Sequence, residues 1–219
     1  MRGGLECGKI QAECRDGSDA SGGKATERIG MSVSAVKSMC KIIAAMAFAV
    51  PLELAAASKV VYVVPGGAGE QTGADWENAL ATPQVAVDKL GAEGGTVYLG
   101  EGTFTGPQPI LNLTTPVTVI GEGKGRTTLL PDNSAAQPTV VNACAGAVVR
   151  GVTITGNSKA RALKFTGLAG IVEQCCIGTN TMGGVWFSGN TCSGLVSRCE
   201  IACNTGADKG GGVFFDYNG

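Results

Sequence analysis

Few side chains in the second half of the chain are suited to acid–base, nucleophilic or metal chemistry. The sequence contains no histidine, which excludes Ser-His and Cys-His nucleophile pairs and removes the commonest metal ligand. Its repeated region has only four carboxylates, Glu173, Glu200, Asp208 and Asp216. A polysaccharide lyase would need an acidic calcium cluster and a basic proton acceptor on one outer face. We therefore expect no catalytic residue, no metal site and no cofactor. Arg150 is interpreted as an ion-pair partner of Glu173 in the next repeat rather than as a catalytic base.

Two further patterns resemble chemical motifs. The segment GEGKGR (121–126) is rich in glycine, but it lacks the spacing and the Lys-Ser/Thr ending of a phosphate-binding loop, and no helix is predicted after it. A turn is the better interpretation. Six cysteines follow the predicted leader, and none of them forms a C-x-x-C pair, so a zinc site is not indicated: Cys144, Cys175, Cys176, Cys192, Cys199 and Cys203. Cys175 and Cys199 occupy equivalent repeat positions; we favour buried thiols, and a disulfide between them stays open.

The composition indicates many short strands. The 219 residues include 35 glycines, aromatic residues make up 5% and charged residues 16% of the chain, and the hydrophobic fraction of 44% argues against disorder. The net charge of −1 provides no basic field for nucleic acid, which is excluded as a partner. Such a chain is long enough for one domain with a hydrophobic core.

An internal repeat predicts how these strands are arranged. VVRGVTITGN (Val148–Asn157), IVEQCCIGTN (Ile171–Asn180) and LVSRCEIACN (Leu195–Asn204) align without a gap, at offsets of 23 and then 24 residues. A period in the low twenties indicates one short unit per repeat, stacked on its neighbours. Because each unit consists of short strands separated by Gly and Asn, we predict an all-β fold, a right-handed parallel β-helix of about five coils.

Equivalent repeat positions are expected to stack as columns. We predict that the aliphatic columns point inward and that Asn occupies turn positions, where it tolerates left-handed backbone angles and bonds to its stacked copies. The predicted columns are Val148, Ile171 and Leu195; Val152, Cys175 and Cys199; Ile154, Ile177 and Ile201; and Asn157, Asn180 and Asn204.

A second recurring strand provides the candidate binding residues. In ALKF, GVWF and GVFF, one set of residues is expected to point inward: Leu163, Val185 and Val213. Strand alternation then sends Lys164, Trp186 and Phe214 outward as one ladder. Exposed aromatic side chains often mark a contact surface, and their flat faces suit sugar rings or another protein. The alternative, that a loop or a second subunit covers them, stays open.

The segments before the repeats predict a leader and a cap. Residues 1–30 form an unstructured extension or reflect a misassigned start, since Met31 opens a segment with Lys37 and Lys41, an apolar run and an Ala55–Ala57 cleavage site. We expect residues 31–57 to be a signal peptide, with no membrane span after its removal. Residues 58–106 are predicted to form an N-terminal cap and first coil, with a short helix that begins at Thr82-Pro83, ends at Gly91 and has Val85, Ala86 and Leu90 on one face. Residues 107–219 form the remaining coils.

Two repeated motifs support a family resemblance. GGVWFSGN (Gly183–Asn190) and GGGVFFDYN (Gly210–Asn218) each join a Gly-Gly-x-hydrophobic element to F-x-x-N. They resemble the repeats of chlamydial polymorphic outer membrane proteins, and residues 60–219 are similar to the wider pectate-lyase-like family of exported β-helix proteins. The resemblance implies a secreted or cell-surface protein. No closing cap follows Asn218-Gly219, so we expect further coils of the same chain.

The function expected from the sequence is an extracellular or cell-surface module that adheres or binds carbohydrate without catalysis. Its expected partners are a polysaccharide or a surface protein, and the candidate ligand-binding residues are Lys164, Trp186 and Phe214. The alternative is the N-terminal part of a polysaccharide lyase or related carbohydrate-active enzyme whose catalytic residues lie on other coils.

Overall fold

The computed structural model of the chain describes residues 58–134, 139–159, 161–206 and 210–216. The chain divides into two units, Met1–Leu54 and Ala55–Gly219, and all described residues belong to the second. The predicted extension and most of the predicted leader belong to the first unit, and both lie outside the described residues.

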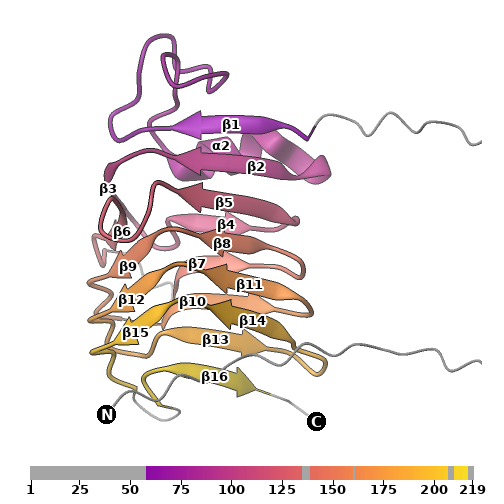
Figure 1. Cartoon of the computed structure of the whole chain (residues 1–219), viewed down its shortest axis with the longest axis vertical. Helices are drawn as coiled ribbons and strands as arrows, with labels where there is room; N and C mark the ends of the chain where they lie inside the picture. Colours follow the sequence, from indigo (N-terminus) through magenta and orange to yellow (C-terminus); the bar gives the residue numbers. More distant parts are fainter. Residues whose placement is uncertain (1–57, 135–138, 160, 207–209, 217–219) are drawn as a thin grey trace, which may run out of the picture. The chain divides into compact units, whose positions relative to one another are not determined.

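The described part is a β-solenoid built from three parallel sheets (Figure 1). Sheet A consists of β1 (Val60–Val63), β2 (Gly95–Leu99), β5 (Val117–Gly121), β8 (Val148–Arg150), β11 (Gly170–Glu173) and β14 (Gly194–Ser197). Sheet B consists of β3 (Gly102–Gly106), β6 (Thr127–Pro131), β9 (Thr153–Thr155), β12 (Cys176–Gly178) and β15 (Glu200–Ala202). Sheet C consists of β4 (Leu111–Leu113), β7 (Thr139–Ala143), β10 (Arg161–Thr166), β13 (Val185–Ser188) and β16 (Val213–Asp216).

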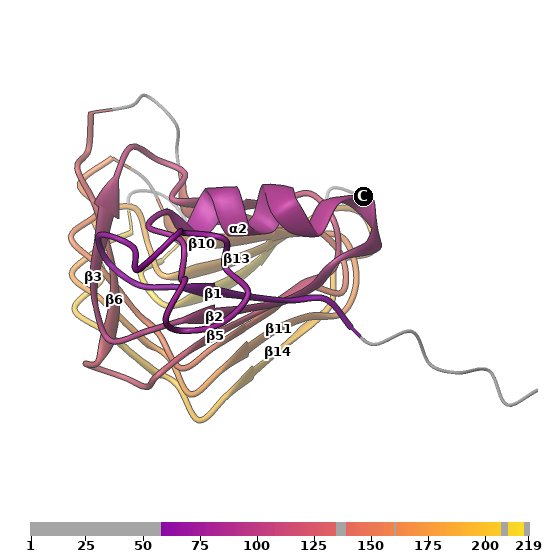
Figure 2. The ribbon, with the colours of Figure 1, turned by 90° about the horizontal axis from the view of Figure 1, so that it is seen from above.

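The chain visits sheets A, B and C in turn and then returns to sheet A one strand further along (Figures 1 and 2). Five such coils follow β1, and they wind in the right-handed sense that parallel crossovers favour. The predicted right-handed parallel β-helix is therefore confirmed. Strand β16 lies at the edge of sheet C, where Val213 and Phe215 are exposed by 42% and 41%.

The core is a set of aliphatic and aromatic ladders along the solenoid axis. Ile154 pairs in register with Ile177, and Ile177 pairs with Ile201, as predicted. Ile154 and Ile177 are fully buried. Phe165 stacks on Phe187 with ring centroids 5.2 Å apart, in the same interior. The interior is therefore apolar and closely packed along the repeated coils.

One predicted ladder points the other way. Leu195 is 54% exposed and Val148 is half-buried, whereas Val149 and Val172 are fully buried. The cause is the single left-handed residue between sheets A and B, such as Gly151 with φ 68°. This residue shifts the inward–outward alternation by one position, so the prediction that the column of Val148, Ile171 and Leu195 points inward is wrong.

The asparagine ladder forms, but its backbone geometry differs from the expectation. Asn180 Nδ2 donates to Asn204 Oδ1 at 2.9 Å, and the Asn157 amide donates to Asn180 Oδ1 at 3.2 Å. The positive φ angles belong to the preceding residues, for example Thr179 at 56° and Cys203 at 55°. The asparagines are therefore used for their side-chain amides, which satisfy buried backbone groups at the turn between sheets B and C.

A short helix covers the first coil, α2 (Pro83–Leu90), and a 3₁₀ turn, Gly91–Glu93, follows it. Helix α2 begins after Thr82 and ends at Gly91, as predicted. Its buried face contains Ala86, Val87 and Leu90, whereas Val85 is 48% exposed, so the prediction that Val85 shares a face with Ala86 and Leu90 is wrong. Val87 and Leu90 are three residues apart and therefore lie on the same face of the helix, whereas Val85 lies on another face.

Candidate functional site

The three residues predicted to form an outward ladder lie in one column on the outer face of sheet C. Lys164 pairs in register with Trp186, and Trp186 pairs with Phe214. The column continues upward through Asn142 and Asn112, which occupy the equivalent positions in β7 and β4. One outer column therefore presents two amides, one ammonium group and two aromatic rings.

The aromatic part of this column is flanked by cations. The ammonium nitrogen of Lys164 lies 4.5 Å from the ring centroid of Trp186. The guanidinium carbon of Arg161 lies 5.3 Å from the same ring and 5.5 Å from the ring of Phe214. Such distances allow attraction between a cation and the electron-rich ring face. Lys164, Trp186 and Phe214 are half-buried, so the ladder is a cation–aromatic cluster rather than a bare aromatic surface.

Trp186 also carries a hydrogen-bond donor in an unusual position. Its indole Nε1 is buried and has no acceptor among the described residues. A buried indole N–H normally finds a partner, because an unmade hydrogen bond is costly.

A hollow of about 290 Å³ lies beside the upper part of the column. It is lined by Asn112, Leu113, Asn142, Ala143, Cys144, Lys164 and Thr166. The lining side chains offer amide, hydroxyl and ammonium groups, and none of them is a carboxylate. Thr139 Oγ1 hydrogen-bonds to Asn142 Oδ1, which fixes the amide of Asn142. The hollow can therefore donate and accept several hydrogen bonds, with a positive charge at one side.

Cys144 lines this hollow as a neutral thiol. Burial raises its pKa above the ordinary value, and its Sγ lies 3.3 Å from the carbonyl oxygen of Ala145. Because the thiolate is the reactive species, this environment does not activate Cys144 as a nucleophile.

The deeper cysteine column is structural. Cys175 is fully buried, its Sγ lies 3.2 Å from the carbonyl oxygen of Glu173, and burial raises its pKa to about 12. Cys199 lies below it, half-buried, and both are free thiols, as we favoured from the sequence. Groups of three or more metal-ligating side chains are not found among the described residues.

The GEGKGR segment (121–126) is a turn between sheets A and B. Its backbone amides are already used inside the solenoid, since Gly123 donates to the Gly151 carbonyl at 2.9 Å and Gly125 donates to Thr153 Oγ1 at 2.8 Å. These amides cannot surround a phosphate in the manner of a phosphate-binding loop, which confirms the interpretation as a turn.

Arg150 and Glu173 form the ion pair that their repeat positions predicted, at 2.6 Å. Arg198 of the following coil binds the other oxygen of the same carboxylate, a contact that the alignment did not anticipate. The three side chains therefore make a charge ladder across three coils. Its arginines are engaged by Glu173, which supports a structural role.

The sequence interpretation missed three residues of the candidate site: Asn112, Asn142 and Arg161. A signal for the first two was present, because Leu111-Asn112-Leu113 and Val141-Asn142-Ala143 share the alternation of the later ALKF strand. No such signal was present for Arg161. Its guanidinium reaches the aromatic rings by passing close to Gly183, where a Cβ atom would lie 2.7 Å from the guanidinium nitrogen Nη1.

None of the helices in the part of the chain that the structure describes is long and apolar enough to cross a membrane. Comparison with protein-family models finds no matching family, and comparison with curated proteins finds no matching sequence. The functional assignment therefore depends on the geometry of sheet C and of its neighbouring faces.

Proposed function

We propose that this chain is an extracellular or cell-surface β-helix module that binds a polysaccharide on the outer face of sheet C without cleaving it. The observation that carries the proposal is the alignment of Asn112, Asn142, Lys164, Trp186 and Phe214 in one column beside a polar hollow. Sugar recognition needs an apolar face for the ring and several hydrogen-bonding groups for its hydroxyls.

The charge beside the hollow favours an acidic polysaccharide. Lys164 lines the hollow, which has no carboxylate in its lining, whereas Asp216 lies at the far end of the face, in β16. A sugar carboxylate bound in the hollow would gain from the ammonium group of Lys164, whereas a cationic ligand would be repelled there. The resemblance of the F-x-x-N repeats to those of exported β-helix proteins supports a place outside the cell.

The repeated geometry of the solenoid suits a polymer. Equivalent positions recur at one strand separation, about 4.8 Å, along the axis. A chain of sugar rings laid along the column therefore meets a new side chain of the column at each coil. Short contacts repeated in this way add affinity without a deep pocket.

Binding to an array of polysaccharides and titration calorimetry test this proposal on residues 58–219. We expect Trp186→Ala to weaken binding of the best acidic glycan about tenfold, which corresponds to about 1.4 kcal/mol. Lys164→Ala should weaken binding less at high salt than at low salt, because its contribution is electrostatic. Lys159→Ala, an exposed cation on the turn between sheets B and C, is the matched control and should bind as the wild type does.

Product analysis separates binding from cleavage. The glycan recovered after prolonged incubation should keep its length; appearance of unsaturated or shortened products would instead support the lyase alternative. The proposal fails if the wild type binds no glycan, or if Trp186→Ala binds as tightly as the wild type while circular dichroism shows both to be folded.

A further inference from the structure

A second group of aromatic residues lies on the outer face of sheet A, at the N-terminal end of the solenoid. Tyr62 and Tyr98 pair in register and their rings stack at 5.5 Å, with 15° between their planes. Trp76 packs edge-on against both, at 4.7 Å from Tyr62 and 6.5 Å from Tyr98. These three residues form an aromatic cluster. In a chain with only 5% aromatic residues, such a group is unusual on an outer face.

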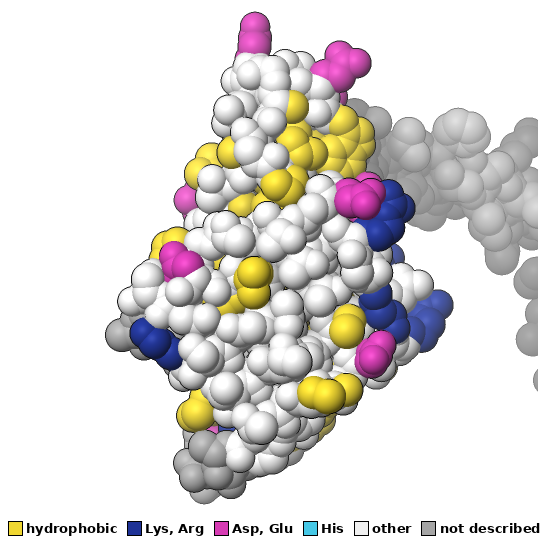
Figure 3. All heavy atoms as spheres, turned by 90° about the vertical axis from the view of Figure 1, so that its left-hand side faces the viewer, with side chains coloured by type: hydrophobic (Ala, Val, Ile, Leu, Met, Phe, Trp, Pro, Cys, Tyr) yellow, Lys and Arg dark blue, Asp and Glu magenta, His cyan; other side chains and the backbone are white. Residues whose placement is uncertain are grey.

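The aromatic cluster is accessible and held in place. Trp76 is 40% exposed. Its loop is tied to strand β1, because the amide of Tyr62 donates to the Gly73 carbonyl at 3.0 Å and the amide of Gly73 donates to the Asn78 carbonyl at 2.6 Å. Figure 3 shows hydrophobic side chains gathered at this upper end, with charged side chains beneath them along one edge. A fixed and exposed ring loses little entropy when a ligand binds.

A hollow of about 450 Å³ follows the aromatic cluster along the same outer column. The register runs from Tyr98 to Ile120 and from Ile120 to Arg150, and the last two residues line the hollow. Glu122, Lys124 and Gln174 line it as well. Tyr98 and Arg150 are two strand separations apart, about 10 Å, a span comparable with two linked sugar rings.

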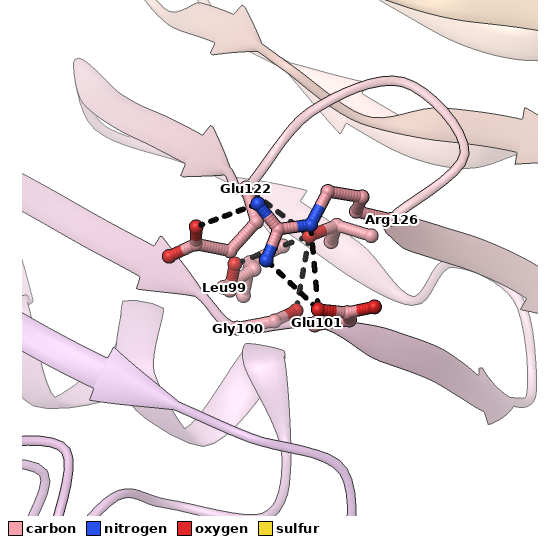
Figure 4. Close-up of polar contacts among 6 residues, drawn as sticks. Leu99, Gly100, Glu101, Glu122 and Arg126 are labelled. Carbon is pink, nitrogen blue, oxygen red and sulfur yellow. Dashed lines mark hydrogen bonds and ion pairs between the residues drawn. The ribbon is translucent and has the colours of Figure 1, made fainter.

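Lys124 is a cation of this hollow that makes no ion pair within the described residues, although the carboxylate of Glu122 also lines the hollow. Arg126 binds Glu101 at 2.8 Å and lies 3.8 Å from Glu122 (Figure 4). Arg150 binds Glu173 at 2.6 Å. Lys124, which is exposed, makes no ion pair with any residue in the described ranges. A ligand anion would therefore meet a free ammonium group at this position.

We propose that the outer face of sheet A is a second glycan-binding site, which takes an acidic oligosaccharide. One sugar ring stacks on the aromatic cluster, and a carboxylate or sulfate about two rings away pairs with Lys124 beside Gln174. Because the turn amides at Gly123 and Gly125 are used within the solenoid, side chains rather than backbone groups hold the anion. The site does not depend on the sheet C face, which lies on a different sheet.

The two faces are separated by testing sheet A in a protein that carries Lys164→Ala and Trp186→Ala. The probes are a tetrasaccharide of alternating glucuronate and N-acetylglucosamine, its neutral carboxyl-reduced form, a sulfated form of the same tetrasaccharide, and inorganic sulfate. We expect the background protein to bind the carboxylate or the sulfated tetrasaccharide, with the neutral form at least tenfold weaker. Inorganic sulfate should bind weakest, because it cannot reach the aromatic cluster.

Single substitutions in this background identify the contacts. Trp76→Ala and Lys124→Ala should each weaken binding about tenfold, and Lys124→Ala should remove the preference for the acidic form. Lys159→Ala is the matched cation control, and amide chemical shifts of Ile120 and Gln174 should move on titration. Loss of all binding in the background protein would overturn this second site while leaving the sheet C proposal in place. Equal affinity for acidic and neutral probes would overturn the role of Lys124, and unchanged affinity in Trp76→Ala would overturn the role of the aromatic cluster.

Discussion

Glu173 shows how one side chain links three coils. Its side chain is only 13% exposed, and its two oxygens contact Arg150 on one side and Arg198 on the other. The hydrogen bond from Arg198, followed by the charges of both arginines, lowers the pKa of this carboxyl against the opposing effect of burial. The ionised form is therefore favoured in the folded protein.

Thermal unfolding across pH tests this charge ladder. Because the folded pKa of Glu173 is lowered, its contribution to stability is present above the unfolded pKa, about 4.3, and is lost as the pH falls through the folded value. We expect Glu173→Gln to lower the melting temperature at pH 7, and the difference from the wild type should shrink as the pH falls below about 4.3. Glu77→Gln, on the exposed loop near Trp76, should leave the melting temperature unchanged. If the difference in melting temperature between the wild type and Glu173→Gln were the same at every pH, ionisation of Glu173 would not contribute to stability.

At the scale of elements, helix α2 replaces a strand above the first coil of sheet C. The side chain of Gln84 imitates a neighbouring strand, since its Oε1 accepts from the amide of Asn112 at 2.7 Å and its Nε2 lies 3.4 Å from the Asn112 carbonyl oxygen. The exposed edge of strand β4 is thereby covered by a helix and by one amide side chain. This arrangement protects an edge that would otherwise be open to pairing with another chain.

Hydrogen exchange tests the role of Gln84. We expect Gln84→Ala to destabilise the protein by about 1 kcal/mol, because the amide and carbonyl of Asn112 lose their partners. The exchange rate of the Asn112 amide should rise more than that of amides in the later coils. Val85→Ala is a suitable control, because Val85 lies on the same helix, is 48% exposed and makes no contact of this kind. Unchanged protection of Asn112 in Gln84→Ala would show that the helix backbone, rather than this side chain, covers the edge.

At the scale of the whole molecule, stability depends on continuous columns. Each coil buries its inward side chains against the coils above and below, so damage to one coil removes the support of its neighbours. Ile177 lies in the middle of the isoleucine column and is fully buried. The aromatic column with Phe165 and Phe187 depends on the same stacking.

Replacing Ile177 by Asp should unfold at least the neighbouring coils, at a cost of more than about 4 kcal/mol, because an unpaired charge enters a dry interior. Chemical denaturation followed by circular dichroism measures this loss. Leu195→Asp is an informative control: the sequence predicted an inward position for Leu195, but its side chain is 54% exposed in the structure. We expect a change within about 0.5 kcal/mol for that variant. A large loss of unfolding free energy in Leu195→Asp would show that Leu195 points inward, as the sequence predicted.

The sequence by itself determined the architecture, because the relevant information is local and repeated. The offset between Ile154 and Ile177 predicts stacked coils, and the alternation around Trp186 predicts which residues share an outer column. Thr82-Pro83 and Gly91 likewise define the ends of helix α2 through local backbone preferences. These features need no knowledge of distant contacts.

Only the tertiary structure decided which side chains lie together on the outer faces of the sheets. The single left-handed residue at Gly151 shifts the alternation between sheets, and the adjacent hydrophobic columns of sheet A do not by themselves say which one is buried. Loops of unequal length separate Tyr62 from Tyr98 and Asn112 from Asn142, so their pairing across coils does not follow a constant period. The contact between the Arg161 guanidinium and the Trp186 ring depends on packing between neighbouring coils. Spacing along the chain specifies the coil, whereas loop length and packing specify which side chains meet on its surface.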